Sequence, residues 1–319
     1  MHEFELIRNY FQKLTKNLPS SLNLNDDVFF DKKNNLVVSV DTYTESNHFI
    51  NFKKPNLVIK KIIRSSISDL ICKGVKPRYY FISASGNKKK FSKLNLSKVS
   101  KSLSEEQKKY KIFLSGGDTV FSNKLSFTIT SIGFAKSIVY RNKAKINDDI
   151  YVSGSLGDSY MGLLVLKNNI KINNSLKKYF TNQYFMPNIQ LKLADIIKKF
   201  ANTSIDISDG LLTDLDKMIN SQKLSYKIKL SDIPISPKLS KVLNSKNLHK
   251  ANYISKGDDY QVLFTAPKSK RGIIKKISLN NRIKLTKIGL IQSHNKKSSI
   301  VDHKNSQIVL KNKGYFHLF

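Results

Sequence analysis

The sequence of 319 residues contains one cysteine and few acidic side chains. Because Cys72 has no partner cysteine, neither an internal disulfide nor a cysteine-based zinc site can form. Its place on an apolar helical stripe predicts core packing. No apolar run approaches the roughly 18 to 20 residues that a membrane-spanning helix needs. Residues 1–6 carry two glutamates where a secretory signal would carry lysines, so we expect a cytoplasmic protein without a membrane anchor.

Negative charge is also scarce. Lysine and arginine number 56 against 23 aspartate and glutamate residues, which gives a formal net charge of +33. Basic surfaces gain affinity for nucleic acid by releasing counterions from phosphates, so nucleic-acid binding is one alternative function. It predicts steeply salt-dependent binding and no need for the aspartates. The lysines are spread through almost every segment, however, which favours a compositional bias and no specific nucleic-acid partner.

The few aspartates recur in similar segments, most of which follow directly on a run of apolar residues, and several of the aspartates precede glycine or threonine. The segments are 25–27, 38–42, 68–69, 115–119 and 205–210. Hard oxygen ligands that converge from several loops suit Mg²⁺ and polyphosphate chemistry. The sequence therefore predicts a Mg²⁺-dependent phosphoryl-transfer enzyme, in which acidic groups far apart in the chain meet in space.

Some of these residues have simpler interpretations. Asp209 could merely cap a helix, with Ser208 as another candidate for the cap. Gly116 and Gly117 could form a hairpin turn instead of letting the backbone approach a phosphate. Asp206 is different because it interrupts an apolar strand and would need a cation or donors if buried.

Apolar periodicity predicts a mixed α/β fold in two parts. Helices are expected over 3–18, 57–75, 96–110, 158–166, 191–200 and 210–219. Strands are expected over 28–30, 36–40, 79–84, 112–114, 125–134, 150–152, 204–207, 226–230, 262–265 and 285–290. Asp41 is expected where the second strand ends, and Asp158 or Ser159 should cap the helix that begins at 158.

Eight ordered blocks of the chain resemble the thiamine-monophosphate kinase family. They are Asn25-Asp26-Asp27, Ser39 to Thr42 with His48, Ser68-Asp69-Leu70 with Gly74 and Pro77, Gly116 to Thr119, Arg141 with Ala144, 150–154 with 157–159, 206–211, and 257–260. The match continues to Gly314-Tyr315 and so covers nearly the whole chain.

The resemblance implies a two-domain fold shared with aminoimidazole ribonucleotide synthetase and with hydrogenase-maturation and selenophosphate-synthetase enzymes. Residues 1–137 would form an α/β domain that binds ATP and Mg²⁺ and makes a homodimer through its sheet. Residues 138–319 would form an α/β domain that closes the active-site cleft. The implied reaction transfers the γ-phosphoryl group of ATP to thiamine monophosphate, without a phosphoenzyme or a single catalytic acid or base.

The resemblance also assigns roles to residues. Several Mg²⁺ ions would be held by Asp27, Ser39, Val40, Asp41, Asp69, Asp118, Asp206 and Asp209. ATP would contact Tyr110, Gly117, Asp118, Arg141 and Ser208. Thiamine monophosphate would contact His48, Asp258 and Tyr315.

Five positions depart from the family pattern. Asn25 replaces glycine, Val40 replaces threonine, Ser66 replaces asparagine, Gln190 replaces arginine and Asp258 replaces glutamate. At Val40 a metal contact could come only from the main chain. The changes leave the acidic set intact and bear on substrate recognition.

Relatives with other activities are the nearest alternatives. Selenophosphate synthetases carry a reactive cysteine or selenocysteine near the N-terminus, which this chain lacks. The hydrogenase-maturation relatives end in a cysteine, where this chain ends in His317-Leu318-Phe319. Aminoimidazole ribonucleotide synthetase is not excluded by any absence, although the 206–210 context favours the thiamine branch.

Overall fold

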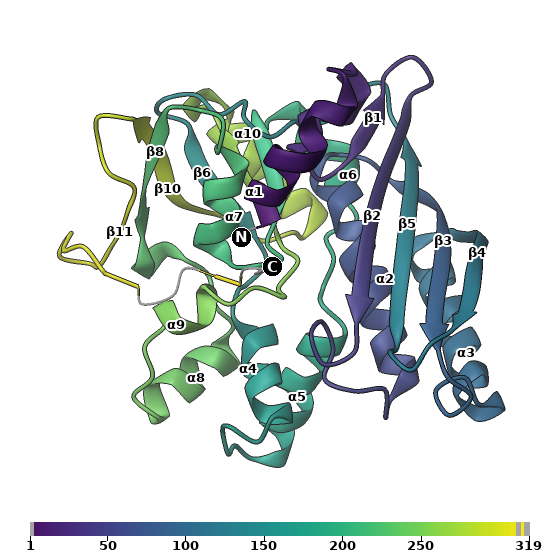
Figure 1. The fold of residues 1–319 in the computed structure, drawn as a ribbon. Coiled ribbons are helices and arrows are strands. Elements are labelled where there is room, and N and C mark those ends of the chain that lie inside the picture. The colour runs from purple at the N-terminus through teal and green to yellow at the C-terminus, as the bar shows by residue number, and fades with distance from the viewer. Residues whose placement is uncertain (1–2, 311–313, 316–319) are drawn as a thin grey trace. The chain divides into compact units, whose positions relative to one another are not determined.

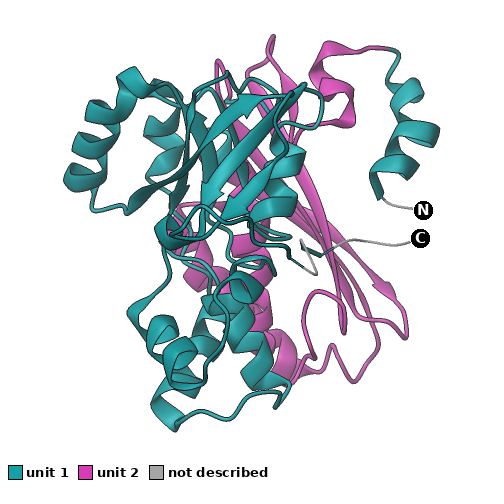
Figure 2. Ribbon diagram, turned by 90° about the vertical axis from the view of Figure 1, so that its left-hand side faces the viewer, with its two compact units in different colours: residues 1–16, 72–74, 139–319 teal, residues 17–71, 75–138 magenta. Residues whose placement is uncertain are grey.

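The computed structural model describes residues 3–310 and 314–315 (Figure 1). The ending at His317-Leu318-Phe319 lies outside the described residues. The chain divides into two compact units (Figure 2). The smaller unit comprises Asn17–Ile71 and Val75–Ile138, and the larger unit comprises Met1–Lys16, Cys72–Gly74 and Val139–Phe319. Each unit contains one sheet with helices, which confirms the mixed α/β prediction.

The smaller unit is built on a five-stranded sheet with the order β1-β2-β5-β3-β4. Its strands are β1 (Phe29–Asp31), β2 (Leu36–Thr44), β3 (Pro77–Gly86), β4 (Phe113–Phe121) and β5 (Ser126–Phe134). Only β3 and β4 pair in parallel. Strands β1 and β2 form a hairpin, and Asp31 stabilises its turn by accepting the N–H groups of Lys33 and Asn34. Strand β2 continues to Thr44, so Asp41 lies inside the strand and not at its end.

Helices α2 (Pro55–Cys72) and α3 (Lys93–Tyr110) belong mainly to this unit. The apolar stripe of α2 is buried, as its periodicity predicts, and Cys72 is buried with it. Ser66 on α2 and Ser131 on β5 approach within 2.9 Å through their hydroxyl oxygens, which places this helix against one face of the sheet. Gly74 then adopts a φ of +76°, a left-handed conformation that favours glycine after a helix end.

Strand β4 extends beyond the predicted strand 112–114, and the alternative of a hairpin turn at the two glycines is wrong. Gly116 and Gly117 lie within β4 and pair with Phe81 and Ile82 of β3. A Cβ atom on Gly117 would lie 1.9 Å from the backbone oxygen of Ile82, so this close approach requires glycine. All nine residues of β4 are exposed.

The larger unit contains a six-stranded sheet with the order β11-β8-β10-β6-β9-β7. Its strands are β6 (Asp149–Ser153), β7 (Thr203–Asp206), β8 (Leu224–Lys229), β9 (Val262–Ala266), β10 (Leu285–Ser293) and β11 (Ser299–Val301). Its helices include α1 (Glu3–Leu6), α4 (Asp158–Leu166), α5 (Asn174–Phe185), α6 (Leu193–Ile196), α7 (Leu211–Met218), α8 (Pro237–Ser245), α9 (Ala251–Ile254) and α10 (Arg271–Asn281).

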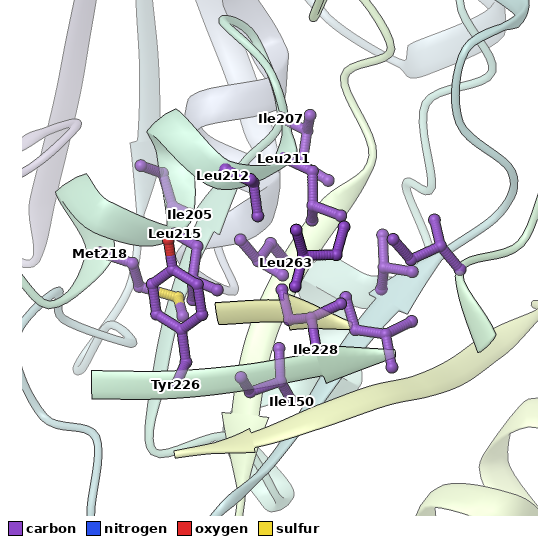
Figure 3. Packing of buried hydrophobic residues seen from close by; sticks show 14 of the residues in the cluster. Ile150, Ile205, Ile207, Leu211, Leu212, Leu215, Met218, Tyr226, Ile228 and Leu263 are labelled. Carbon is purple, nitrogen blue, oxygen red and sulfur yellow. The ribbon is translucent and has the colours of Figure 1, made fainter. Parts of the chain in front are cut away.

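Helix α7 packs its apolar stripe on this sheet (Figure 3). Leu211 and Leu215 share a buried cluster with Ile150 on β6, Ile228 on β8 and Leu263 on β9. Burial of these side chains stabilises the unit by about 1.5–3 kcal/mol each. The same packing fixes the loop from β7 to α7, which carries Ser208 and Asp209.

Three expectations for the larger unit are wrong. The periodic segment 3–18 forms only α1, then a π-turn (Ile7–Phe11) and a 3₁₀ turn (Gln12–Thr15), and none of these residues is buried. The segment 191–200 forms α6 and a 3₁₀ turn (Ile197–Lys199). Helix α4 is capped by Gly157, with Asp158 as its first residue and no capping side chain. Within residues 3–310 and 314–315, no helix is both long and apolar enough to cross a bilayer.

The buried ion pair between α2 and α3 predicts a large difference between two neighbouring substitutions. Arg64 donates to both carboxylate oxygens of Glu106, at 2.8 and 2.9 Å, and both residues are buried. Arg64→Met would leave Glu106 buried without its cation, so we expect a loss of about 3–5 kcal/mol in the free energy of unfolding. Chemical denaturation of the purified protein measures this loss.

The matched control is Lys60→Met on the same helix. Lys60 pairs with Glu105, which is exposed, so this substitution should change stability far less. Equal destabilisation by the two variants would contradict the assigned importance of the buried pair.

Candidate active site

In the smaller unit, the structure gathers three of the predicted ligands. One carboxylate oxygen of Asp27 lies within 4.8 Å of one from Asp69. The hydroxyl of Ser39 donates to Oδ2 of Asp69 at 2.5 Å. These residues come from the loop before β1, from α2 and from β2, so elements distant in sequence converge here.

Asp41 follows Ser39 by two residues on β2, and alternation along the strand turns both side chains to the same face. Its Oδ2 atom is out of reach of solvent and has no hydrogen-bond partner among the described residues. Loss of water raises the pKa of Asp41 to about 7, and hydrogen bonds with Ser66 and Tyr43 offset only part of this effect. A buried carboxylate oxygen without a donor indicates a place for a cation.

The donor set fits Mg²⁺. Asp27, Asp41 and Asp69 supply carboxylate oxygens, Ser39 supplies a hydroxyl oxygen, and oxygen is the ligand type that this ion prefers. Val40 lies between Ser39 and Asp41, and its side chain is exposed on the opposite face of the sheet. Only its main chain could therefore reach a metal on the Asp41 side.

His48 is half-buried in the turn after β2. Its Nδ1 atom accepts the backbone N–H of Thr44 at 3.0 Å. Its ring packs edge-on against Tyr43, with the centroids 5.9 Å apart. Because Nδ1 is the acceptor, the neutral ring carries its proton on Nε2.

Asp118 lies apart from the other acidic residues of the smaller unit. It is exposed on the edge strand β4, and its Oδ1 accepts the N–H of Thr119. Across the sheet, Asp118 on β4 pairs with Ser83 on β3, which pairs with Thr128 on β5. Thr128 pairs in turn with Thr42 on β2, the neighbour of Asp41. Three inter-strand spacings of about 4.8 Å separate β4 from β2, roughly 14 Å, which is too far for one ion to bind both within the sheet.

Tyr110, a predicted ATP contact, is buried at the end of α3. Its ring lies 5.7 Å from the guanidinium carbon of Arg64, and burial raises the pKa of its hydroxyl to about 12. The structure therefore shows a packing role for the ring.

In the larger unit, the β7–α7 loop carries the predicted acidic pair. Asp206 ends β7 and is buried, while Asp209 is partly exposed. Neither Ser208 nor Asp209 caps α7, because Gly210 occupies that position. Asp214, one turn into the helix, instead accepts the N–H groups of Asp209 and Gly210 at 2.9 and 3.0 Å.

Two residues that are predicted to contact the substrate form backbone hydrogen bonds with this loop. The backbone N–H of Asp258 donates to the carbonyl of Ser208 at 2.8 Å, and that of Tyr315 donates to the carbonyl of Asp209 at 2.9 Å. Gly257 permits the contact, since a Cβ there would lie 2.1 Å from the Ser208 oxygen. The larger unit thus brings Ser208, Asp209, Asp258 and Tyr315 together.

Two residues to which the sequence assigned no role support this arrangement. Asp259 is buried and accepts the N–H of Gly157, and burial raises its pKa well above the usual range. Lys217 pairs with both Asp209 and Asp214. Burial lowers the pKa of Lys217, but these two carboxylates outweigh burial and the nearby positive charge of Arg141, so the pKa is raised overall.

Gln190, where the family carries arginine, lies beside the buried Gln261. Its Nε2 donates to Oε1 of Gln261 at 3.3 Å, and the same oxygen accepts the hydroxyl of Ser153. An uncharged side chain fits here because its partner is an amide and not a carboxylate.

Comparison with known proteins shows that these two α/β units have a fold of the aminoimidazole ribonucleotide synthetase type. The family model described as AIR synthase related protein, N-terminal domain, matches residues 25–135. A solved structure described as AaThiL complexed with AMPPCP and TMP is similar, with a TM-score of 0.85 and 25% identity over 99% of this chain and 97% of that one.

Curated relatives show to which family within this class the chain belongs. The thiamine-monophosphate kinase of Buchnera aphidicola subsp. Acyrthosiphon pisum is 32% identical over 99% of this chain and 98% of its own length. That of Haemophilus influenzae is 32% identical over 84% of this chain and 82% of its own. The chain therefore belongs to the thiamine-monophosphate kinase family.

Asp41 predicts how stability without metal depends on pH. Its pKa is about 7 in the folded chain against 3.8 for an ordinary aspartate, so between these values the folded state holds a proton that the unfolded state has released. The stability from this group is complete below the lower value and is lost as pH rises to the higher one. Bound Mg²⁺ would neutralise the ionised form, so the rise in melting temperature on adding Mg²⁺ should be larger at pH 8 than at pH 6.

Thermal unfolding of Asp41→Asn provides the control. Its amide does not titrate, so the pH dependence of the Mg²⁺ effect should become weaker than in the wild-type protein. An equal Mg²⁺ effect at both pH values in the wild type would contradict the role given to Asp41.

Proposed function

We propose that this chain transfers the γ-phosphoryl group of ATP to thiamine monophosphate, giving thiamine diphosphate and ADP. Full-length similarity to curated thiamine-monophosphate kinases supports the reaction, and a solved relative described as holding AMPPCP and TMP supports the pair of substrates. The structural observation that carries the proposal is the buried Oδ2 of Asp41, on the same face of β2 as Ser39 and its partner Asp69.

The reaction needs positioning more than covalent chemistry. Two phosphate groups must approach in line although both are anionic, and the phosphoryl group passes directly between them. When bound, Mg²⁺ would supply positive charge that offsets this repulsion. The residues proposed to hold it are Asp27, Ser39, Asp41 and Asp69, the main chain at Val40, Asp118, and Asp206 with Asp209.

Roles for the remaining side chains follow the family resemblance. Gly117, Arg141 and Ser208 would contact ATP, with Tyr110 as a further contact. His48, Asp258 and Tyr315 would contact thiamine monophosphate. For Asp258 and Tyr315, the hydrogen bonds to the Ser208–Asp209 backbone support a shared site with these two residues. We also propose a cytoplasmic location, and a division of labour between residues 1–137 and 138–319.

Substitution of a proposed ligand tests the reaction. Asp41→Asn and Asp209→Asn each remove one carboxylate from the proposed metal set, so formation of thiamine diphosphate from ATP, Mg²⁺ and thiamine monophosphate should fall about 100-fold or more, with folding retained. Chromatography of the product measures the rate. Asp232→Asn, at an exposed aspartate of the larger unit, is the control and should keep wild-type activity.

Wild-type turnover in either ligand variant would refute the metal assignment. Absence of thiamine diphosphate with the wild-type protein, together with activity on an aminoimidazole ribonucleotide synthetase substrate, would favour the sibling reaction instead.

A homodimer through the smaller unit's sheet is also proposed. Strand β4 is an edge strand, and its exposed side chains include Phe113, Leu114, Val120 and Phe121. An apolar edge of this length is a site for association with another copy. A second copy would also give the Asp118 carboxylate, distant from Asp41 in its own sheet, a place in a shared site.

Phe121→Asp should therefore convert the dimer to a monomer, because a charge would be buried in an apolar contact. Light scattering after size-exclusion chromatography measures the mass. Leu94→Asp, at an exposed leucine on α3, should leave the dimer intact. A wild-type monomer, or a Phe121→Asp dimer, would contradict the proposed interface.

A further inference from the structure

Lys217 on α7 has no role in the reaction as proposed above, yet it forms an ion pair with the proposed metal ligand Asp209. Its ammonium Nζ contacts Oδ2 of Asp209 and lies 3.4 Å from Oδ1 of Asp214. Only 14% of its side chain is exposed. A lysine held here by two carboxylates is a fixed positive charge within the larger unit.

The two carboxylates that Lys217 contacts are not equivalent. Asp214 is fully buried, and its Oδ2 accepts two backbone N–H groups of the β7–α7 loop. These hydrogen bonds give Asp214 a structural role, because they fix the conformation of the loop. Asp209 keeps 21% of its side chain exposed, and Lys217 is the cation on its carboxylate. Asp209 is therefore the one of the two that can exchange its cation.

We propose that Lys217 is the resident counter-ion of Asp209, which Mg²⁺ replaces, and that Asp214 retains the displaced ammonium in the site. This inference rests on the proposed function, in which Asp209 is a metal ligand. The move is short, because an ammonium group has three donors and already lies between both carboxylates.

The exchange has a consequence for the order in which the site fills. With Lys217 paired to Asp209 and the positive charge of Arg141 nearby, a divalent cation gains little from entering alone. An anionic nucleotide changes that balance, since its phosphates attract the metal and both side-chain cations. Lys217 thus acts as a positioning residue that lowers the affinity of Asp209 for the metal until the nucleotide binds.

Binding of Mn²⁺ to the nucleotide-free, full-length protein tests the inference. Lys217→Met removes the competing cation, so Mn²⁺ measured by calorimetry or electron paramagnetic resonance should bind roughly fivefold more tightly than to the wild type. Lys217→Arg keeps the charge and should bind as the wild type does. Lys223→Met removes one exposed charge from the same unit and controls for the lower net charge.

Asp209→Asn separates this inference from the proposed function. Introduced into Lys217→Met, it should remove the gain in Mn²⁺ affinity, because the released carboxylate is then absent. If the gain in Lys217→Met persists without Asp209, the metal role of Asp209 fails. If Lys217→Met alone gives no gain, the counter-ion role of Lys217 is overturned.

A second variant guards against misfolding. Lys217→Met leaves Asp214 buried without its cation, whereas Lys217→Met with Asp214→Asn leaves a neutral amide that can still accept the loop N–H groups. This double variant should melt within a few degrees of the wild type and show the same tighter Mn²⁺ binding. Unchanged binding in the folded double variant would also overturn the inference.

Discussion

Keeping carboxylates in places that water does not reach is the constraint on which both units depend. An ionised carboxylate out of water is costly unless donors or a cation meet it. Asp259 is met by the backbone N–H of Gly157, and Asp214 by two loop N–H groups and Lys217. Oδ2 of Asp41 is met by none of the described groups. The hydrogen bonds to the first two aspartates therefore stabilise their loops, whereas the donor-free Oδ2 of Asp41 supports the proposal that this residue binds a cation.

The excess of basic residues does not conflict with a cation-binding site. At physiological ionic strength, charges separated by more than about 8 Å are largely screened, so the local groups around each aspartate decide whether a cation binds. Within the same range, the excess of lysine and arginine at the surface attracts the reactants, which are anionic phosphates, and favours their encounter with the protein. The groups next to each aspartate and the surrounding basic surface thus act on different ions.

Much of the fold could be predicted because its signals are local. The apolar stripes of α2 and α7 and the β-branched run of β5 each specify one element. The expectation failed where a pattern has no buried partner, as at Phe4 and Leu14, which are exposed in irregular helical turns. The alternative of a hairpin turn at Gly117 is also wrong, because the glycine is required there by the carbonyl of Ile82, which comes from another strand. Helix α8 was missed although Ser236-Pro237 is a good helix start.

In the candidate site, too, some residues could be predicted from local sequence and others could not. Asp206 could be recognised because it interrupts a run of apolar residues, and Asp41 because it follows the mostly apolar residues 36–40. Asp214 and Lys217 occupy ordinary positions of a helix, and their meaning appears only when the loop N–H groups and Asp209 are seen around them. Asp118 shows the opposite case. Its sequence motif resembles that of a metal ligand, but the sheet register places it three strands from Asp41. Rotation of side chains within one chain cannot close this distance. A ligand role for Asp118 therefore involves either a different ion from that at Asp41 or, in the proposed dimer, a site that a second copy completes at the apolar edge of β4.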